Sequence, residues 1–100
     1  MAAERNWTFL TNHAHVLLAV AASPDLRLKD IAERVDITER TATLILADLE
    51  SVGCVERVKK GRRNHYIVRS DLPLRHPLEE HHQIADLIQA IGHHASTEPN

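Results

Sequence analysis

The stretch that decides the fold is LKDIAERVDITERTATLILADLESVG, residues 28–53. Its apolar residues recur every three or four positions in two runs, which predicts amphipathic helices over residues 29–35 and 39–52. The connection 36–38 is so short that the two helices must cross steeply. Thr38 is the expected N-cap of the second helix, and Gly53 is its expected end. The pattern predicts a helix-turn-helix.

A basic β-hairpin is expected directly after this unit. Residues 54–58 and 65–69 are predicted strands, the second of them rich in aromatic and β-branched residues. The polar segment 59–64 contains Gly61 and is the predicted hairpin loop. Between residues 57 and 69 there are six Lys or Arg and no Asp or Glu, although the whole chain has a net charge of -2. The hairpin is therefore a localised basic surface.

Further helices are expected on both sides. Helical spacing predicts one over residues 7–21, with Trp7 as a core anchor, and a very short strand over 26–28. Pro77 suits the first position of a helix within 74–92. Residues 1–6 and 93–100 are interpreted as a disordered arm and a frayed tail. The predicted fold is mainly α with a small β-hairpin (α+β), one domain over residues 7–92 with a DNA-binding core over 26–69.

Composition narrows the class of protein. One hundred residues with 43% hydrophobic and 26% charged side chains are typical of one globular domain. One cysteine allows no intrachain disulfide, and no signal peptide or membrane-spanning run is recognisable. We therefore expect a cytoplasmic protein without a membrane partner. The sequence has no phosphate loop, paired catalytic carboxylates or nucleophile–base pattern, so we expect no enzyme activity and no cofactor.

The order of the predicted elements indicates a function. A helix presented by a helix-turn-helix fits the major groove of DNA, which is about 12 Å wide. A basic hairpin beside it can reach the phosphates or the minor groove. Double-stranded DNA is thus the predicted partner.

The residues that carry this pattern resemble the helix-turn-helix of the MarR and ArsR superfamily of bacterial repressors. The resemblance covers residues 26–69, with its clearest parts at 28–43, 49–57 and 61–66. It implies a winged helix-turn-helix with N- and C-terminal dimerisation helices. It also implies a homodimer on a palindromic operator, with recognition helices about one DNA turn, roughly 34 Å, apart. The effector is not readable from the sequence.

Matching residue by residue assigns three sets of contacts. In the recognition helix the DNA-binding residues are Thr38, Glu39, Arg40, Thr41, Thr43 and Leu44, and Arg40 is the expected reader of guanine. In the wing they are Lys59, Lys60, Arg62, Arg63 and Asn64. The expected dimer interface comprises Trp7, Leu10, Leu17, Leu78, Ile84, Leu87, Ile88 and Ile91.

Three alternatives stay open. The recognition helix has one arginine, no lysine and the acids Glu39, Asp48 and Glu50, so the domain can instead be a module that binds another protein. Eight histidines leave room for an ArsR-type metal sensor. No metal site is assigned, because no two histidines are three or four residues apart on one helix. Cys54 can be a thiol sensor, but a small buried hydrophobe is favoured.

Overall fold

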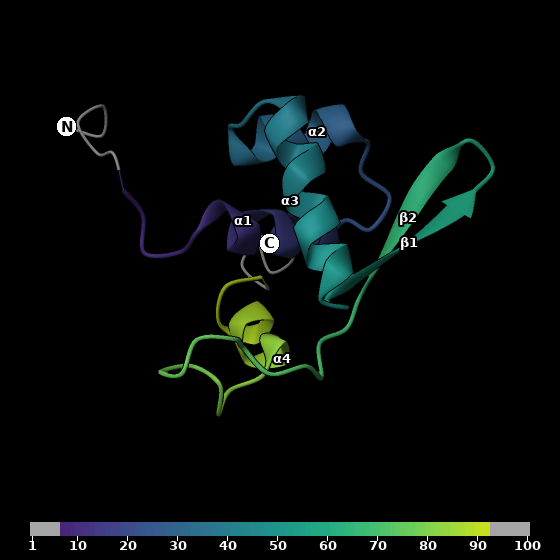
Figure 1. The fold of residues 1–100 in the computed structure, drawn as a ribbon. Helices are drawn as coiled ribbons and strands as arrows, with labels where there is room; N and C mark the ends of the chain where they lie inside the picture. Colours follow the sequence, from purple (N-terminus) through teal and green to yellow (C-terminus); the bar gives the residue numbers. More distant parts are fainter. Residues whose placement is uncertain (1–6, 93–100) are drawn as a thin grey trace, which may run out of the picture.

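A computed structural model describes residues 7–92. Three helices form a bundle, a two-stranded antiparallel hairpin projects from it, and a short C-terminal helical segment packs against the first helix (Figure 1). The elements are α1 (Asn12–Ala22), α2 (Leu28–Val35), α3 (Glu39–Ser51), β1 (Val55–Lys60), β2 (Arg63–Val68), α4 (Ile84–Leu87) and the π-helical turn η2 (Ile88–Gly92).

The helix-turn-helix is confirmed, with its turn and caps where the sequence predicted them. After α2, Asp36 adopts a left-handed φ of 67°, a conformation that aspartate tolerates better than most residues. Thr38 is the N-cap of α3, and its hydroxyl accepts a hydrogen bond of 3.0 Å from the Thr41 amide. Gly53 follows α3 with a φ of +82°, so the chain turns sharply into β1.

One hydrophobic core joins the three helices to the base of the hairpin. Val16, Val20 and Ile31 are its most deeply buried large side chains. The hairpin contributes Val55 and Tyr66 to the same cluster. Burying these apolar surfaces against one another is the main force that holds α3 on the body.

The hairpin is longer than the sequence predicted, because its turn is shorter. Lys59 pairs with Asn64 and Lys60 with Arg63, so a two-residue turn replaces the expected six-residue loop. Gly61 has a φ of +65°, which a two-residue turn between twisted strands requires. The basic residues therefore lie mostly on a regular ladder.

The predicted start of the first helix at Trp7 is wrong. The helix begins at Asn12, where the Thr11 hydroxyl caps it by accepting from the Ala14 amide at 3.3 Å. Trp7 is 68% exposed and meets Phe9 edge to face, with ring centroids 5.1 Å apart, so it is not a core anchor. The helical spacing of apolar residues extends toward the N-terminus beyond Thr11, the capping residue at which the helix begins.

The short strand expected over residues 26–28 is absent from the described residues. In its place the backbone at Pro24 makes one ladder-like contact with the hairpin, because the Tyr66 amide donates to the Pro24 carbonyl at 2.9 Å. Leu26 and Leu28 pack half-buried against the core. Their apolar side chains thus pack against the core without forming a strand.

The predicted start of a helix at Pro77 is also wrong. Residues 69–83 form a loop closed by a bridge between Pro73 and Gln83, and the Ile84 amide donates to the Leu72 carbonyl at 2.8 Å. Helix begins only at Ile84, where the Asp86 carboxylate accepts from the Gln83 amide at 2.9 Å. These contacts satisfy the backbone of a segment that sequence periodicity assigned to a helix.

The residues expected at a dimer interface fall into three groups. Leu17 and Ile84 are buried in the chain's own core, so they are not presented to a second copy. Leu10, Leu87 and Ile88 are half-buried, whereas Trp7, Leu78 and Ile91 are exposed. The expected arm and tail at residues 1–6 and 93–100 lie outside the described residues.

Of the helices in the described part of the chain, none has the length and apolar character needed to cross a membrane.

Candidate nucleic-acid interface

Helix α3 has one buried face and one open face. Ala42, Ile45, Leu46 and Leu49 are buried against the body. The open face consists of Glu39, Arg40, Thr43, Leu44, Ala47 and Asp48. Its leading turn is not packed inside the molecule, so the predicted recognition surface is accessible from its first residue onward.

Thr38 and Thr41 serve the helix cap in this structure. The Thr38 hydroxyl accepts from the Thr41 amide and donates to the Thr41 hydroxyl at 2.9 Å. Thr41 is half-buried. Of the threonines predicted to bind DNA, Thr43 is the one whose side chain is exposed on the open face without a hydrogen bond inside the described part of the chain.

The hairpin carries the cationic part of the surface. Lys59, Lys60 and Arg62 are exposed, and within residues 7–92 they form no ion pair. Arg63 is held differently, because its Nη2 donates to the Asp25 carbonyl at 2.6 Å. Asn64 is half-buried. Three of the five predicted wing residues therefore have charges available for a partner.

Asp25 attaches strand β2 to the connection between α1 and α2. Its Oδ1 lies 2.7 Å from His65 Nδ1. The hydrogen bond with His65 lowers the pKa of the Asp25 carboxyl, and the charges of His65, Lys60 and Arg63 add to the effect. One carboxylate thus anchors the hairpin on the side that faces the bundle.

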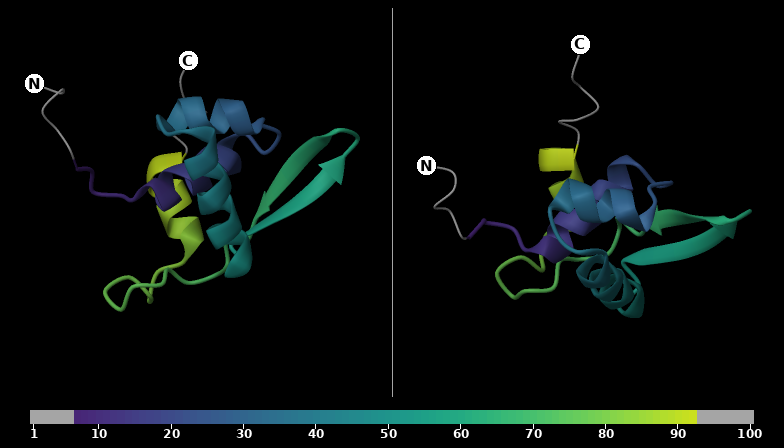
Figure 2. Two further views of the ribbon diagram at one scale, coloured as in Figure 1. Left: turned by 45° about the horizontal axis from the view of Figure 1, so that its top comes forward. Right: turned by 90° about the horizontal axis from the view of Figure 1, so that it is seen from above.

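Arg57 and Glu50 join the hairpin to α3 itself. Arg57 Nε lies 2.9 Å from Glu50 Oε2, and Arg57 Nη2 donates to Glu50 Oε1 at 3.1 Å. This two-point geometry fixes the orientation of the guanidinium as well as its distance. In two views the hairpin leaves the body beside the end of α3 and extends away from it (Figure 2).

The acidic side chains of α3 are less unfavourable for DNA binding than the sequence indicated. Glu50 is paired with Arg57, and Asp48 Oδ2 lies 2.8 Å from His13 Nε2 on α1. His13 and Asp48 are 35 positions apart. Sequence reasoning missed this contact, because no local pattern links the two residues.

The surroundings of Cys54 favour its interpretation as a small buried hydrophobe. Cys54 is buried beneath the loop 69–83, and burial raises the pKa of its thiol, which disfavours the reactive thiolate. Over residues 7–92, no three His, Cys, Asp or Glu side chains gather closely enough to hold a metal ion. His93 and His94 lie outside the described residues.

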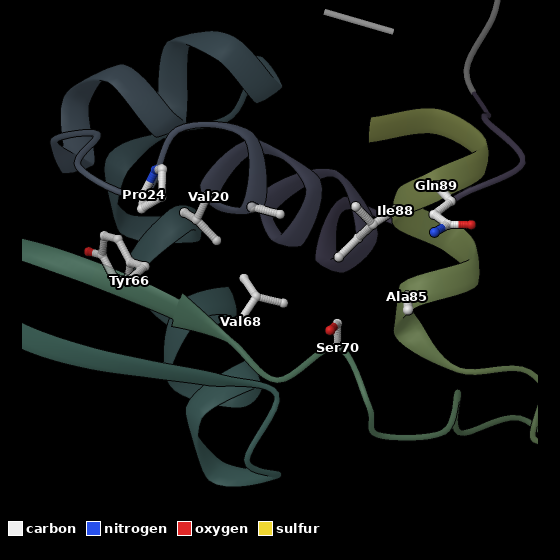
Figure 3. Close-up of a pocket in the computed structure, with 9 residues that line it drawn as sticks. Val20, Pro24, Tyr66, Val68, Ser70, Ala85, Ile88 and Gln89 are labelled. Atoms are coloured by element: carbon white, nitrogen blue, oxygen red, sulfur yellow. The ribbon is translucent and has the colours of Figure 1, made fainter. Parts of the chain in front are cut away.

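A mostly apolar hollow of about 400 Å³ lies between α1, strand β2 and the C-terminal helical segment. Figure 3 shows Val20, Tyr66, Val68 and Ile88 around it, with Ser70 and Gln89 toward one end. Among residues 7–92, none of the side chains that line it is charged. It therefore offers apolar surface rather than an ion-binding site.

Comparison with solved structures identifies the architecture. The chain is similar to the PcaV transcriptional regulator from Streptomyces coelicolor, solved in complex with its natural ligand, with 26% identity and a TM-score of 0.52. It is also similar to MepR, a transcription regulator of the Staphylococcus aureus multidrug efflux pump MepA, with 24% identity and a TM-score of 0.52. The fold is that of a winged-helix transcriptional regulator. In this winged helix, α3 is the recognition helix and the β1–β2 hairpin is the wing.

The extent of these matches differs. They cover 59% of this winged-helix chain and 44% of PcaV, and 58% of this chain and 45% of MepR. T. potens IscR matches over 95% of this chain and 94% of its own, with 16% identity and a TM-score of 0.58, which indicates a shared fold. No protein-family model and no curated protein matches the sequence.

Proposed function

We propose that this winged-helix protein is a sequence-specific regulator of transcription that binds double-stranded DNA. In the proposed complex the open face of α3 lies in the major groove and the wing contacts the phosphate backbone. The observation that carries the proposal is the pairing of an exposed recognition face with a projecting hairpin whose Lys59, Lys60 and Arg62 are unpaired within residues 7–92. The similar solved proteins PcaV and MepR are transcription regulators, which supports it.

We further propose that it acts as a homodimer on a palindromic operator, in the manner of the repressors that it resembles. Trp7, Phe9 and Leu78 are large apolar side chains that stay strongly exposed in the single chain. The described segment that precedes α1, which includes both aromatic residues, extends away from the wing (Figure 1). Contact between two copies through such residues would remove apolar surface from water and leave both wings free.

The contacts of Arg40 give the sharpest test of this function. Arg40 is exposed in the first turn of α3, and it forms no ion pair among the described residues. Its guanidinium matches the O6 and N7 acceptors of guanine. We expect Arg40→Ala to lose base preference at one position per half-site, which corresponds to about 1–3 kcal/mol.

The measurement is fluorescence anisotropy with duplexes chosen by selection from random sequence, and with scrambled duplexes as the reference. Arg75→Ala is the matched control, because Arg75 is an exposed arginine of the loop 69–83. A wild-type protein that binds selected and scrambled duplexes equally at low salt would contradict the proposed function.

A second candidate function follows from Leu44, which is 59% exposed on the recognition face. An exposed leucine at this place also suits a module that binds another protein through α3. That function predicts that Leu44→Ala leaves DNA affinity unchanged. Binding to DNA through the major groove predicts the opposite.

A further inference from the structure

The middle of the recognition face is apolar. Leu44 projects there with 59% of its surface exposed, and its exposed neighbours Thr43 and Ala47 are uncharged. Charged side chains stand only toward the two ends of the face: Arg40 is four residues before Leu44, and Asp48 is four residues after it. A spacing of four residues places all three side chains along one face of the helix.

Two polar groups next to this region are engaged by other side chains of the protein. The Thr41 hydroxyl is engaged with Thr38, and the Asp48 carboxylate is held by His13 at 2.8 Å. A surface that meets the middle of α3 therefore encounters the aliphatic carbon of Leu44 and Ala47, with the hydroxyl and methyl groups of Thr43 beside it.

The edges of base pairs in the major groove offer one apolar group, the C5-methyl group of thymine. The helix rises about 1.5 Å per residue, so Arg40 and Leu44 are separated by about 6 Å along its axis. Stacked bases are about 3.4 Å apart. A base under Leu44 thus lies within about two base-pair steps of the base under Arg40.

We propose that Leu44 is a specificity-determining residue that reads the methyl group of a thymine close to the guanine read by Arg40. This inference rests on the proposed DNA-binding function and states which bases the half-site must contain. DNA is favoured over a protein partner because the wing that projects beside the end of α3 carries three cations, Lys59, Lys60 and Arg62, that form no ion pair within residues 7–92.

The test replaces single thymines of the selected duplex by uracil, which removes the methyl group and leaves the hydrogen-bonding edge unchanged. Removal of one buried methyl group corresponds to a loss of affinity of about four-fold. We expect that loss at one thymine of each half-site for the wild-type protein. Leu44→Ala should bind the thymine and uracil duplexes equally, and Leu44→Met should retain most of the discrimination.

Two control variants separate the role of Leu44 from other contacts. Thr43→Ser removes the neighbouring methyl group of the protein but keeps its hydroxyl, and it should discriminate as the wild type does. Lys60→Ala removes a charge on the wing, so it should weaken binding to both duplexes alike. Circular dichroism of each variant verifies that the fold is kept, which we expect because all three side chains are exposed.

The outcomes of this test are distinct. If the wild-type protein selects a preferred sequence but tolerates uracil at every position, the role of Leu44 is overturned and the DNA-binding function stands. If Thr43→Ser rather than Leu44→Ala abolishes the discrimination, Thr43 reads the methyl group and the inference is also overturned. If no sequence is preferred at all, the proposed function fails together with it.

Discussion

The recognition helix and the wing differ in the number of unpaired positive charges that they expose within residues 7–92. The open face of α3 has one unpaired cation within residues 7–92, Arg40, and an apolar middle around Leu44. The wing has three such cations, Lys59 and Lys60 at the end of β1 and Arg62 in the turn. Phosphates are the same at every position of a duplex and base edges are not. If the protein binds DNA as proposed, we therefore expect the wing to supply mainly affinity and α3 mainly discrimination between sequences.

The two regions also differ in how they are held. Helix α3 is fixed by its buried face, which belongs to the core of the bundle. Beyond the core residues at its base, the wing is held by polar contacts, with Asp25 on one side and the Arg57–Glu50 pair on the other. Apolar packing tolerates little displacement, whereas exposed ion pairs are individually weak. We therefore expect the wing to adjust more readily than α3 when DNA binds.

The largest expected effect comes from removing the charge of the wing. Replacing Lys59, Lys60 and Arg62 together by glutamine should lower the affinity for every duplex by about a hundred-fold at physiological salt, and should reduce the salt dependence of log K by roughly three. The order of preference among sequences should not change. Anisotropy titrations at several salt concentrations measure both quantities.

Arg75→Gln is the control for this substitution, because it removes an exposed positive charge from the loop 69–83 rather than from the wing. An equal loss of affinity for Arg75→Gln would mean that net charge, and not the position of the wing, governs binding. A change in the preferred sequence on removing the wing charges would contradict the expectation that α3, and not the wing, discriminates between sequences.

A smaller effect is expected from the pair that joins the two regions. Glu50→Gln and Arg57→Gln should each lower the free energy of unfolding, and the double variant should lose less than the sum of the two. The coupling energy should be about 0.2–1 kcal/mol, because both side chains are partly exposed to solvent. Urea unfolding of the four proteins measures it. Fully additive losses would show that the pair does not hold the wing to α3.

The smallest effect concerns Asp25, whose side chain is 67% exposed. Its folded-state pKa lies below the usual value of 3.8, so its ionised form stabilises the folded protein above that pH. This contribution is lost as the pH falls through the lowered pKa. In thermal unfolding between pH 6 and pH 3, the melting temperature of the wild type should therefore approach that of Asp25→Asn at the acidic end.

Glu79→Gln is the control for Asp25→Asn, since it removes an exposed carboxylate from the loop 69–83. It should follow the wild-type profile across the same range of pH. A constant difference between wild type and Asp25→Asn from pH 6 to pH 3 would contradict the anchoring role of Asp25.

Prediction from the sequence was most accurate where structure depends on near neighbours. Thr38 lies three residues from the amide that it caps, and Gly53 takes the backbone conformation in which the helix ends. It failed where a competing local or distant contact decides. The first helix begins after its N-cap Thr11 rather than at Trp7. The bridge between Pro73 and Gln83 keeps the segment between these two residues out of a helix.

The candidate site divides in the same way. Its exposed members, among them Arg40, Leu44, Lys60 and Arg62, were readable because solvent exposure on an amphipathic helix and in a basic hairpin follows from periodicity and composition. The partners of its charges were not readable. His13 with Asp48, and His65 with Asp25, are pairs far apart in the chain.

The amino-acid order alone determined that there would be a helix-turn-helix followed by a basic hairpin, because helix periodicity, capping and turn residues act over a few positions. Only the tertiary structure decided which acids on and beside that surface have a partner side chain and how the wing is attached. Those outcomes depend on distances between residues that the fold, and not the sequence, brings together.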